Sequence, residues 1–407
     1  MPIGITHRIA GEQVGVKGII LRMSDRVYLD WNATTPLRDE ARRAIASALD
    51  LAGNASSVHA EGREARKWIE GARAAVAIAI GAAPRNVVFT SGGTEANALA
   101  LAPKVRRGSG PAVERLVVSA IEHASVLAGG RFLQSQIETV RVTTAGVVDL
   151  DHLRQLLHDR PPALVSIMLA NNETGAIQPI AAVAGIVHEA SGLLHVDAIQ
   201  AFGKIPLDMA ALGADLLTLS AHKIGGPKGV GALVLAEGLS GLEPLLRGGG
   251  QELSRRAGTE NVAGIAAFGA AAAAAMTDLA ADSRRLSGLR ERLEKGLRQT
   301  NDAIIFSDSV QRLPNTTLFT VPGLRAETAV IGFDLAGIAV SSGSACSSGK
   351  VQPSHVLEAM GFDPDIARGA VRLSMGWSTR DADIERCLKA WRRLSGSLLK
   401  DQGRNTA

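Results

Sequence analysis

Between residues 86 and 235, short apolar runs alternate with longer stretches of helical composition, and this alternation limits the possible folds more than any other feature. The apolar runs predict strands at 86–89, 115–118, 163–168, 193–196, 214–219 and 231–235. Continuously apolar strands separated by helices are typical of a mostly parallel sheet that is covered on both faces. The predicted fold is therefore α/β, and ligands are expected beyond the carboxyl ends of its strands.

The composition excludes several classes of protein. Two cysteines in 407 residues are too few for a disulfide-stapled scaffold or a cysteine-rich metal site, so we expect a reducing, cytoplasmic location and no resident metal. The net charge of +4 comes without a long run of Lys or Arg, which argues against a nucleic-acid partner. The alanine-rich stretch 269–276 ends before membrane-spanning length, because Asp278 follows it, so no membrane association is expected.

A change of pattern after Met276 predicts a second, smaller domain. Residues 283–297 form an amphipathic helical pattern with leucines at three- and four-residue intervals. We expect next a strand at 316–320, a helix near 326–337, a Gly/Ser loop at 341–349 and a closing helix at about 382–399. The predicted division is a large domain of residues 35–276 and a small domain of residues 24–34 and 277–407. Residues 1–23 are an unassigned leader, either unstructured or the product of an over-long start, since Met23 offers a second start.

The segment 88–97, Val-Phe-Thr-Ser-Gly-Gly-Thr-Glu-Ala-Asn, leads from a predicted strand through two glycines into a predicted helix. Glycines allow close approach of the backbone, and the helix N-terminus offers N–H groups to a phosphate. Gly93 and Thr94 are therefore candidate phosphate-binding residues. The alternative is an ordinary turn in which Thr94 caps the helix.

Asp197 and Lys223 follow two successive predicted strands and lie 26 residues apart, a spacing that suits one crossover between neighbouring parallel strands. A lysine that forms a Schiff base, an acid that holds a pyridinium nitrogen and a helix end for a phosphate are what pyridoxal phosphate requires. Taken singly, Asp197 could cap a helix and Lys223 could be a solvated loop lysine.

Two more polar segments follow predicted strands. His123, after the strand at 115–118, could stack on a cofactor ring and transfer protons, or could be an ordinary hydrogen-bonded loop histidine. Asn172 lies in Asn-Asn-Glu-Thr-Gly and could bond a cofactor oxygen or the substrate, although turn formation would explain this segment equally well.

The two cysteines differ in their surroundings. Cys346 lies in a Gly/Ser segment, Ser-Ser-Gly-Ser-Ala-Cys, which is unusual for a residue type that is mostly buried, and it is the candidate nucleophile. Cys387 lies at helical spacing from Ile384, which predicts core packing.

Taken together, these segments resemble the cysteine desulfurases, a branch of the class V aminotransferases within the fold-type-I pyridoxal phosphate enzymes. The matching motifs run in order along nearly the whole chain after residue 25; they are 27–30, 33–36, 54–59, 91–95, 122–123, 171–173, 195–197, 220–223, 256–261, 341–346 and 371–374. The resemblance implies a large domain with a seven-stranded sheet and a smaller α+β domain.

The resemblance also implies a role for each matched residue. Lys223 would carry the Schiff base with pyridoxal 5'-phosphate, Asp197 would contact the pyridinium nitrogen, Gln200 or Asn172 would bond the ring oxygen, and His123 would stack and transfer protons. Phosphate ligands would be Gly93, Thr94, Ser220 and His222, with Thr259 added from the partner subunit of a homodimer. Arg372, with Asn172, would bind the substrate, and Cys346 would be the nucleophile.

The implied reaction converts L-cysteine to L-alanine and transfers sulfur to Cys346 as a persulfide, then to an acceptor such as an iron–sulfur scaffold protein. Cys346 could also transiently ligate an iron–sulfur cluster. The segment around Cys346 is similar to that of members that deliver sulfur to scaffolds, whereas the short tail after the last helix fits the nitrogen-fixation type better. Alternatives are a selenocysteine lyase or aminotransferase of the same family, and a catalytically silent partner-binding subunit.

Overall fold

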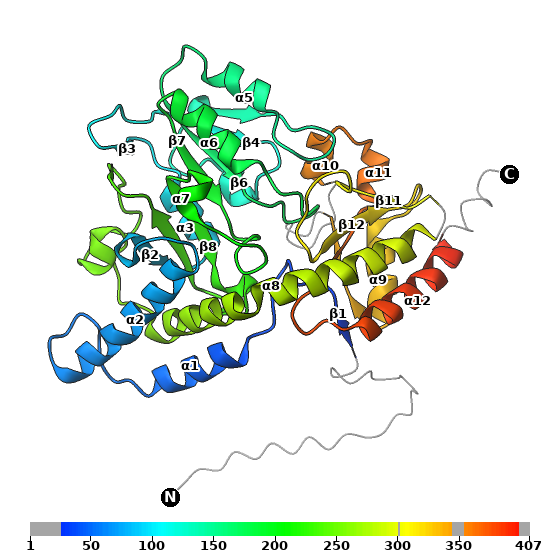
Figure 1. The fold of residues 1–407 in the computed structure, drawn as a ribbon, viewed down its shortest axis with the longest axis horizontal. Coiled ribbons are helices and arrows are strands. Elements are labelled where there is room, and N and C mark those ends of the chain that lie inside the picture. The colour runs from blue at the N-terminus through cyan, green and yellow to red at the C-terminus, as the bar shows by residue number, and fades with distance from the viewer. Residues whose placement is uncertain (1–25, 300–301, 344–353, 399–407) are drawn as a thin grey trace, which may run out of the picture.

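The computed structural model describes residues 26–299, 302–343 and 354–398 of the chain (Figure 1). Its largest element is a seven-stranded sheet with the strand order β2-β9-β8-β7-β6-β4-β5. The strands are β2 (Val87–Thr90), β4 (Arg115–Ser119), β5 (Ile137–Val140), β6 (Ala163–Met168), β7 (Leu193–Asp197), β8 (Leu216–Ser220) and β9 (Gly231–Leu235). Only β9 runs antiparallel to its neighbours within this sheet. The predicted α/β fold with a mostly parallel sheet is confirmed.

All six strands predicted from apolar runs are present, with ends that differ by two residues at most. The sequence pattern missed β5, which pairs with β4 alone and lies at the edge of the sheet. Its middle residues, Glu138 and Thr139, are not buried, so β5 lacks the continuous apolar run by which the central strands were recognised.

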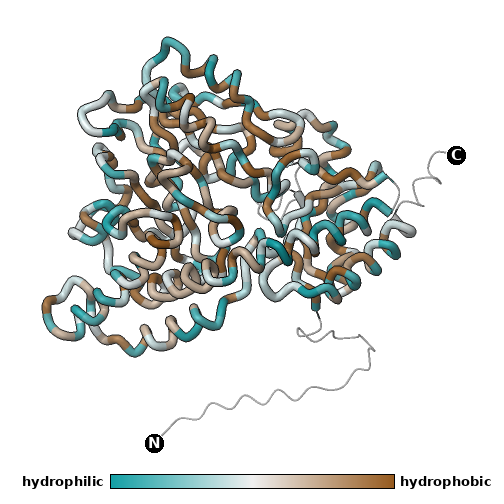
Figure 2. The backbone as a smooth tube through the Cα atoms, in the orientation of Figure 1, coloured by the Kyte–Doolittle hydropathy of each residue, from teal (hydrophilic) through white to brown (hydrophobic). Residues whose placement is uncertain are grey.

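Both faces of this sheet are buried, because alternate side chains of each strand enter different cores. Val117 and Val165 belong to one hydrophobic cluster, whereas their neighbours Leu116 and Leu164 belong to another. The helices associated with this sheet are α1 (Asp39–Leu49), α2 (Ala60–Ile78), α3 (Gly93–Ala100), α4 (Ala124–Leu127), α5 (Leu150–Leu157), α6 (Ile180–Glu189) and α7 (Met209–Leu212). Figure 2 shows apolar segments concentrated in the interior between these layers.

A single helix of 37 residues, α8 (Val262–Arg298), runs along both parts of the molecule (Figure 1). Its first half packs on α1 and α2, and a Cβ at Gly269 would lie 2.5 Å from the Ala72 Cα, so this close approach requires glycine. The predicted leucine stripe of its second half, 286, 289, 293 and 297, is buried in a separate cluster, as the spacing indicated. One window of α8 is long and apolar enough to cross a membrane, but 50% of it is buried in the protein, as in a core helix.

The second half of α8 packs with a four-stranded antiparallel sheet of order β11-β12-β15-β14. Its strands are β11 (Ile304–Ile305), β12 (Thr316–Thr320), β14 (Ser341–Ser342) and β15 (Val371–Ser374). Around them lie β1 (Val27–Tyr28), which pairs with β13 (Ile338–Ala339), and the helices α9 (Ala326–Leu335), α10 (His355–Ala359), α11 (Pro364–Arg368) and α12 (Asp381–Leu398). Cys387 is fully buried in α12, which confirms that it is a core residue, and burial raises the pKa of its thiol to about 12.

The remaining described elements are a short ribbon of β3 (Arg106–Arg107) with β10 (Leu239–Ser240) and the 3-10 turns η2 (Pro84–Asn86), η3 (Gln134–Gln136), η4 (Ala221–Lys223) and η5 (Gln251–Ser254). We propose to retain the division into 35–276 and 24–34 with 277–407, supported by the separate hydrophobic clusters. The boundary at residue 276 falls inside α8, so a continuous helix would connect the two domains. Residues 1–23 lie outside the described residues.

Candidate active site

A pocket of about 270 Å³ lies where β6, β7 and β8 end, at the edge of the sheet predicted to carry ligands. Its lining includes every predicted site residue except Thr259 and Cys346: Gly93, Thr94, His123, Asn172, Asp197, Gln200, Ser220, His222, Lys223 and Arg372. Residues far apart in the sequence therefore meet at one place.

Lys223 lies in η4, directly after β8. Its Nζ donates to the backbone oxygens of Asn32, at 2.6 Å, and Ala33, at 2.8 Å. The amine is thus held by carbonyl groups of the segment that precedes α1, at the wall of the pocket.

Asp197 is the last residue of β7, the strand beside β8, so the 26-residue spacing does correspond to neighbouring strand ends. Its Oδ2 accepts from Asn97 Nδ2 at 2.9 Å, and its Oδ1 accepts from the Ile199 N–H at 3.0 Å. Burial raises the pKa of Asp197, while these hydrogen bonds and the nearby His123 and Lys223 act in the opposite direction. A cationic ligand atom in the pocket would favour the ionised carboxylate further.

His123 caps the N-terminus of α4 and faces the same pocket. Its Nδ1 accepts from the Ser125 N–H at 3.1 Å and lies 2.8 Å from the Ser125 Oγ. Because a backbone N–H can only donate, the neutral ring carries its proton on Nε2. Burial lowers the pKa of His123, which favours the neutral imidazole.

Asn97, on α3, connects these two groups, since its Nδ2 donates both to Asp197 and to the Ser125 Oγ, the latter at 2.9 Å. Its Oδ1 accepts from the Thr218 hydroxyl at 2.6 Å. The sequence pattern alone gives no role to Asn97. Its position four residues after Gly93, one turn into the predicted helix, is the signal that could have placed it near the pocket.

The N-terminus of α3 opens at the pocket without a side-chain cap. The cap position is Gly92, with φ of +155°, so the alternative in which Thr94 caps the helix is wrong. A Cβ at Gly93 would lie 2.3 Å from Ile199 Cδ1, so a larger residue would require this side chain to move. The first N–H groups of α3 are therefore suited to an anion.

Ser220 and His222 lie at the end of β8 and in η4, beside the same helix terminus. Burial, together with the nearby Lys223, Lys228 and Lys204, lowers the pKa of His222 to about 4. His222 is thus a neutral hydrogen-bonding group at pH 7, with its Nδ1 3.2 Å from the Thr34 Oγ1.

Two successive asparagines follow β6 and have different functions. The side chain of Asn171 is buried and bonds the turn around it, including the N–H groups of Glu173 and Thr174. Asn172 lines the pocket. The turn interpretation therefore applies to Asn171, whereas Asn172 is available to a ligand.

Gln200 lines the pocket and belongs to a hydrogen-bond network that could not be predicted from the sequence. Its Nε2 donates to the Asn32 backbone oxygen at 3.0 Å, and its Oε1 accepts from Lys204 Nζ at 2.7 Å. Asn32 was overlooked because its partners are more than a hundred residues away, and its place beside the Ala33-Thr34-Thr35-Pro36 motif was the available signal.

Arg372 reaches the pocket from β15 of the smaller sheet. Its Nη2 pairs with Asp30 Oδ1 at 2.9 Å, and its Nη1 donates to the Asn172 backbone oxygen at 3.1 Å. Within the described chain, Nε is buried and has no hydrogen-bond partner. This donor is suited to an acidic group of a ligand in the pocket.

Thr259 is exposed and does not line this pocket. The neighbouring Arg256 pairs with Glu95 of α3 at 3.0 Å, which places this segment near the α3 N-terminus. Cys346 lies outside the described residues.

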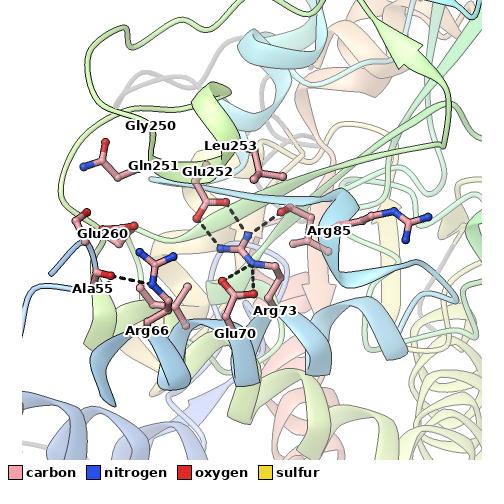
Figure 3. Close-up of a pocket in the computed structure, with 13 residues that line it drawn as sticks. Ala55, Arg66, Glu70, Arg73, Arg85, Gly250, Gln251, Glu252, Leu253 and Glu260 are labelled. Carbon is pink, nitrogen blue, oxygen red and sulfur yellow. Dashed lines mark hydrogen bonds and ion pairs between the residues drawn. The ribbon is translucent and has the colours of Figure 1, made fainter. Parts of the chain in front are cut away.

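A second polar pocket, of about 450 Å³, lies between α2 and η5 (Figure 3). At its base Arg73 bonds both oxygens of Glu252, at 2.7 and 2.8 Å, and also Glu70. Glu252 in turn accepts from the Phe89 N–H at 2.9 Å, although its own φ is +48°. The charged groups at the base of the pocket are thus bonded to one another, and Glu252 holds η5 against β2.

Comparisons with known proteins agree on one family. The sequence profile of the aminotransferase class-V family matches residues 27–387. A cysteine desulfurase of Cereibacter sphaeroides is 43% identical over 372 residues, which cover 90% of this chain and 94% of that protein. A solved NifS-like protein from Rickettsia africae has a TM-score of 0.82 and 39% identity, and the match covers 91% of this chain and 99% of the other. A solved structure of SspA in complex with cysteine has a TM-score of 0.72 and 30% identity, with 86% and 98% covered.

Proposed function

This chain belongs to the class-V aminotransferase family, and we propose that it is a cysteine desulfurase, a sulfurtransferase that uses pyridoxal 5'-phosphate to convert L-cysteine to L-alanine. The observation that carries the proposal is the meeting of Lys223, Asp197, His123 and the Arg372 guanidinium in one pocket. The high identity to a cysteine desulfurase over most of both chains supports it.

The donors and acceptors of the pocket fit the cofactor. Lys223 supplies the amine, and Asp197 supplies a buried carboxylate for the ring nitrogen. The uncapped start of α3 with Gly93, Thr94, Ser220 and His222 supplies neutral donors for the phosphate. Gln200 and Asn172 supply amides for the ring oxygen.

When bound, pyridoxal 5'-phosphate withdraws electrons from the Cα of the amino acid that is attached to it. Lys223 would hold the cofactor through its amine and, once displaced by the substrate amine, would be a base close to the substrate. His123, whose neutral form is favoured by burial, would lie against the cofactor ring and take part in moving protons to and from the substrate. Asp197 would hold the ring nitrogen, and a cationic nitrogen there would keep the carboxylate ionised.

Arg372 binds the substrate carboxylate. It already pairs with Asp30, so the carboxylate meets its unpartnered Nε edge. Asn172, whose backbone oxygen receives a hydrogen bond from Arg372 Nη1, lines the same pocket and would supply its amide to the substrate.

Cys346 accepts the substrate sulfur. Its thiolate attacks that sulfur, an S–S bond forms while the C–S bond breaks, and the carbon fragment takes up a proton and leaves as alanine. The persulfide sulfur then passes to an acceptor protein for iron–sulfur cluster assembly. Lys350, four residues after Cys346, is a candidate for stabilising the thiolate.

A homodimer is part of the proposal, with Thr259 of one chain reaching the phosphate of the other. Thr259 is exposed and does not line the pocket of its own chain, which supports this. The proposed location is the cytoplasm, which keeps the thiol of Cys346 reduced.

The test is incubation of purified protein with L-cysteine, with alanine and sulfide measured for wild type and Cys346→Ala. We expect Cys346→Ala to keep the absorbance of the bound cofactor and to lose sulfide release. Retained turnover of L-cysteine by Cys346→Ala would favour a selenocysteine lyase. Turnover of a keto acid instead would favour an aminotransferase. A colourless protein that does not bind added pyridoxal 5'-phosphate would indicate a silent partner-binding subunit.

A further inference from the structure

Lys204 is a buried lysine beside the Lys223 pocket. It follows β7 in the turn after Gln200, and only 9% of it is exposed. A small cavity of about 30 Å³ is lined by both Lys204 and Lys223. Lysine is rarely buried to this extent unless a partner compensates for the lost hydration, so the contacts of Lys204 need an explanation.

Those contacts are two neutral amide oxygens. Lys204 Nζ lies 2.7 Å from Gln200 Oε1 and 3.1 Å from Asn32 Oδ1. In the described part of the chain, no carboxylate lies within 4.0 Å of this amine. Burial lowers the pKa of Lys204 well below its usual value, and the positive charges of Lys223 and Arg372 act in the same direction. The amine donates to both amide oxygens through two of its N–H groups.

Lys204 Nζ donates to both amides, and these two hydrogen bonds hold the amide oxygens on the side of the amine. The NH₂ group of Gln200 is consequently directed away from Lys204, and it donates to the Asn32 backbone oxygen at 3.0 Å. The NH₂ group of Asn32 donates to the Thr316 Oγ1 at 2.9 Å and to the Asn172 backbone oxygen at 3.2 Å. Gln200 thus directs its NH₂ group, rather than its oxygen, toward the Asn32 carbonyl.

The same Asn32 carbonyl receives Lys223 Nζ at 2.6 Å. A continuous set of hydrogen bonds therefore runs from Lys204 through Gln200 to the atom on which Lys223 rests. Asn32 is further held by Asn315 and by the Ser374 hydroxyl, so the backbone at this point has several supports. Lys204 is the support that acts on Gln200 and Asn32 together.

We propose that Lys204 is a positioning residue of the Lys223 site: it orients the amides of Gln200 and Asn32, so that the pocket presents N–H donors at Gln200 and the Asn32 carbonyl stays in place for Lys223. The inference rests on the proposed function for the identity of the cofactor, but the network itself belongs to the chain.

The experiment compares holoenzyme of wild type, Lys204→Met, Lys204→Gln and, as a matched control, Lys389→Met at an exposed position of α12. Methionine fills a similar volume without a donor, whereas glutamine restores a neutral NH₂ donor. We expect Lys204→Met to shift the pH midpoint of the absorbance of bound pyridoxal 5'-phosphate by about half a unit or more and to lower kcat for L-cysteine about tenfold, as for one lost hydrogen bond. Lys204→Gln should recover part of both, and Lys389→Met should equal wild type.

A wild-type pH midpoint in Lys204→Met would overturn the inference. If Lys204→Met does not fold, Lys204→Leu, which also lacks a donor, takes its place: a midpoint displaced from wild type supports the role of the lysine, and a wild-type midpoint contradicts it. Wild-type protein that binds the cofactor but leaves L-cysteine unchanged would overturn the proposed function alone, since the absorbance comparison does not depend on the substrate.

Discussion

The pocket at Lys223 and the pocket at Arg73 and Glu252 are both polar, but they arrange charge in different ways. In the second, Arg73 is bonded by two glutamates, and Glu252 also receives a backbone N–H (Figure 3). In the first, the Lys223 amine lies on two backbone oxygens, Asp197 accepts from neutral groups, and the Nε of Arg372 has no described partner. Charged groups that neutralise one another hold a structure together. Charged groups such as Lys223 and Asp197, whose described hydrogen-bond partners are neutral, remain available to a ligand.

The largest effect is expected at Lys223. Lys223→Ala should reduce the turnover of L-cysteine by about 10³-fold or more, because the amine that attaches the cofactor and moves protons is lost. The measurement is alanine formation, with circular dichroism to verify that the variant is folded. Turnover within tenfold of wild type would remove Lys223 from the site.

Glu252→Gln should instead lower the stability of the protein and leave cofactor binding unchanged. Removing one partner of a buried ion pair costs about 3 kcal/mol or more, because Arg73 is left without full compensation. Chemical denaturation should show this loss, while the cofactor absorbance of the folded variant stays that of wild type. The control is Glu237→Gln, at an exposed pair with Arg85, which should alter stability little. A Glu252→Gln variant of normal stability that fails to bind cofactor would reverse the comparison.

Arg372→Lys tests the unpartnered donor. Lysine can still pair with Asp30 but cannot offer a planar second edge to a carboxylate. We expect KM for L-cysteine to rise about tenfold to a hundredfold, the size of one charged hydrogen bond, with the cofactor spectrum unchanged. An unchanged KM would show that the substrate carboxylate binds elsewhere.

The smallest effect concerns pH. Since burial lowers the pKa of His123 below 6.5, the neutral base is already dominant at pH 7 and is lost only at lower pH. We expect kcat/KM to change less than about twofold from pH 8 to 7 and to fall below pH 6.5, in proportion to protonation of the base. His123→Gln should lack this fall; the same acidic limb in that variant would assign it to another group.

The sequence predicted the central sheet and much of the site for identifiable reasons. Central strands are apolar on both faces, so each could be recognised as a continuous apolar run. The spacing of Asp197 and Lys223 reflects one crossover between neighbouring strands. The edge strand β5 and the Asn97 link were missed because partial exposure and single polar residues inside helices carry no periodic signal.

The network of Asn32, Gln200 and Lys204 could not be predicted, since it depends on contacts across 168 and 172 residues. The local sequence pattern cannot predict a hydrogen bond between residues so far apart before the fold is known. Arg372 was identified through family resemblance alone, and the structure adds a physical reason for its place: a buried guanidinium whose Nε has no described partner.

The central claim is that the cofactor attaches at Lys223. Holoenzyme reduced with borohydride, digested and analysed by peptide mass should carry the pyridoxyl phosphate group on the peptide that contains Lys223. Attachment at Lys204, Lys228 or another lysine, or the absence of any adduct after reconstitution with pyridoxal 5'-phosphate, would contradict the account.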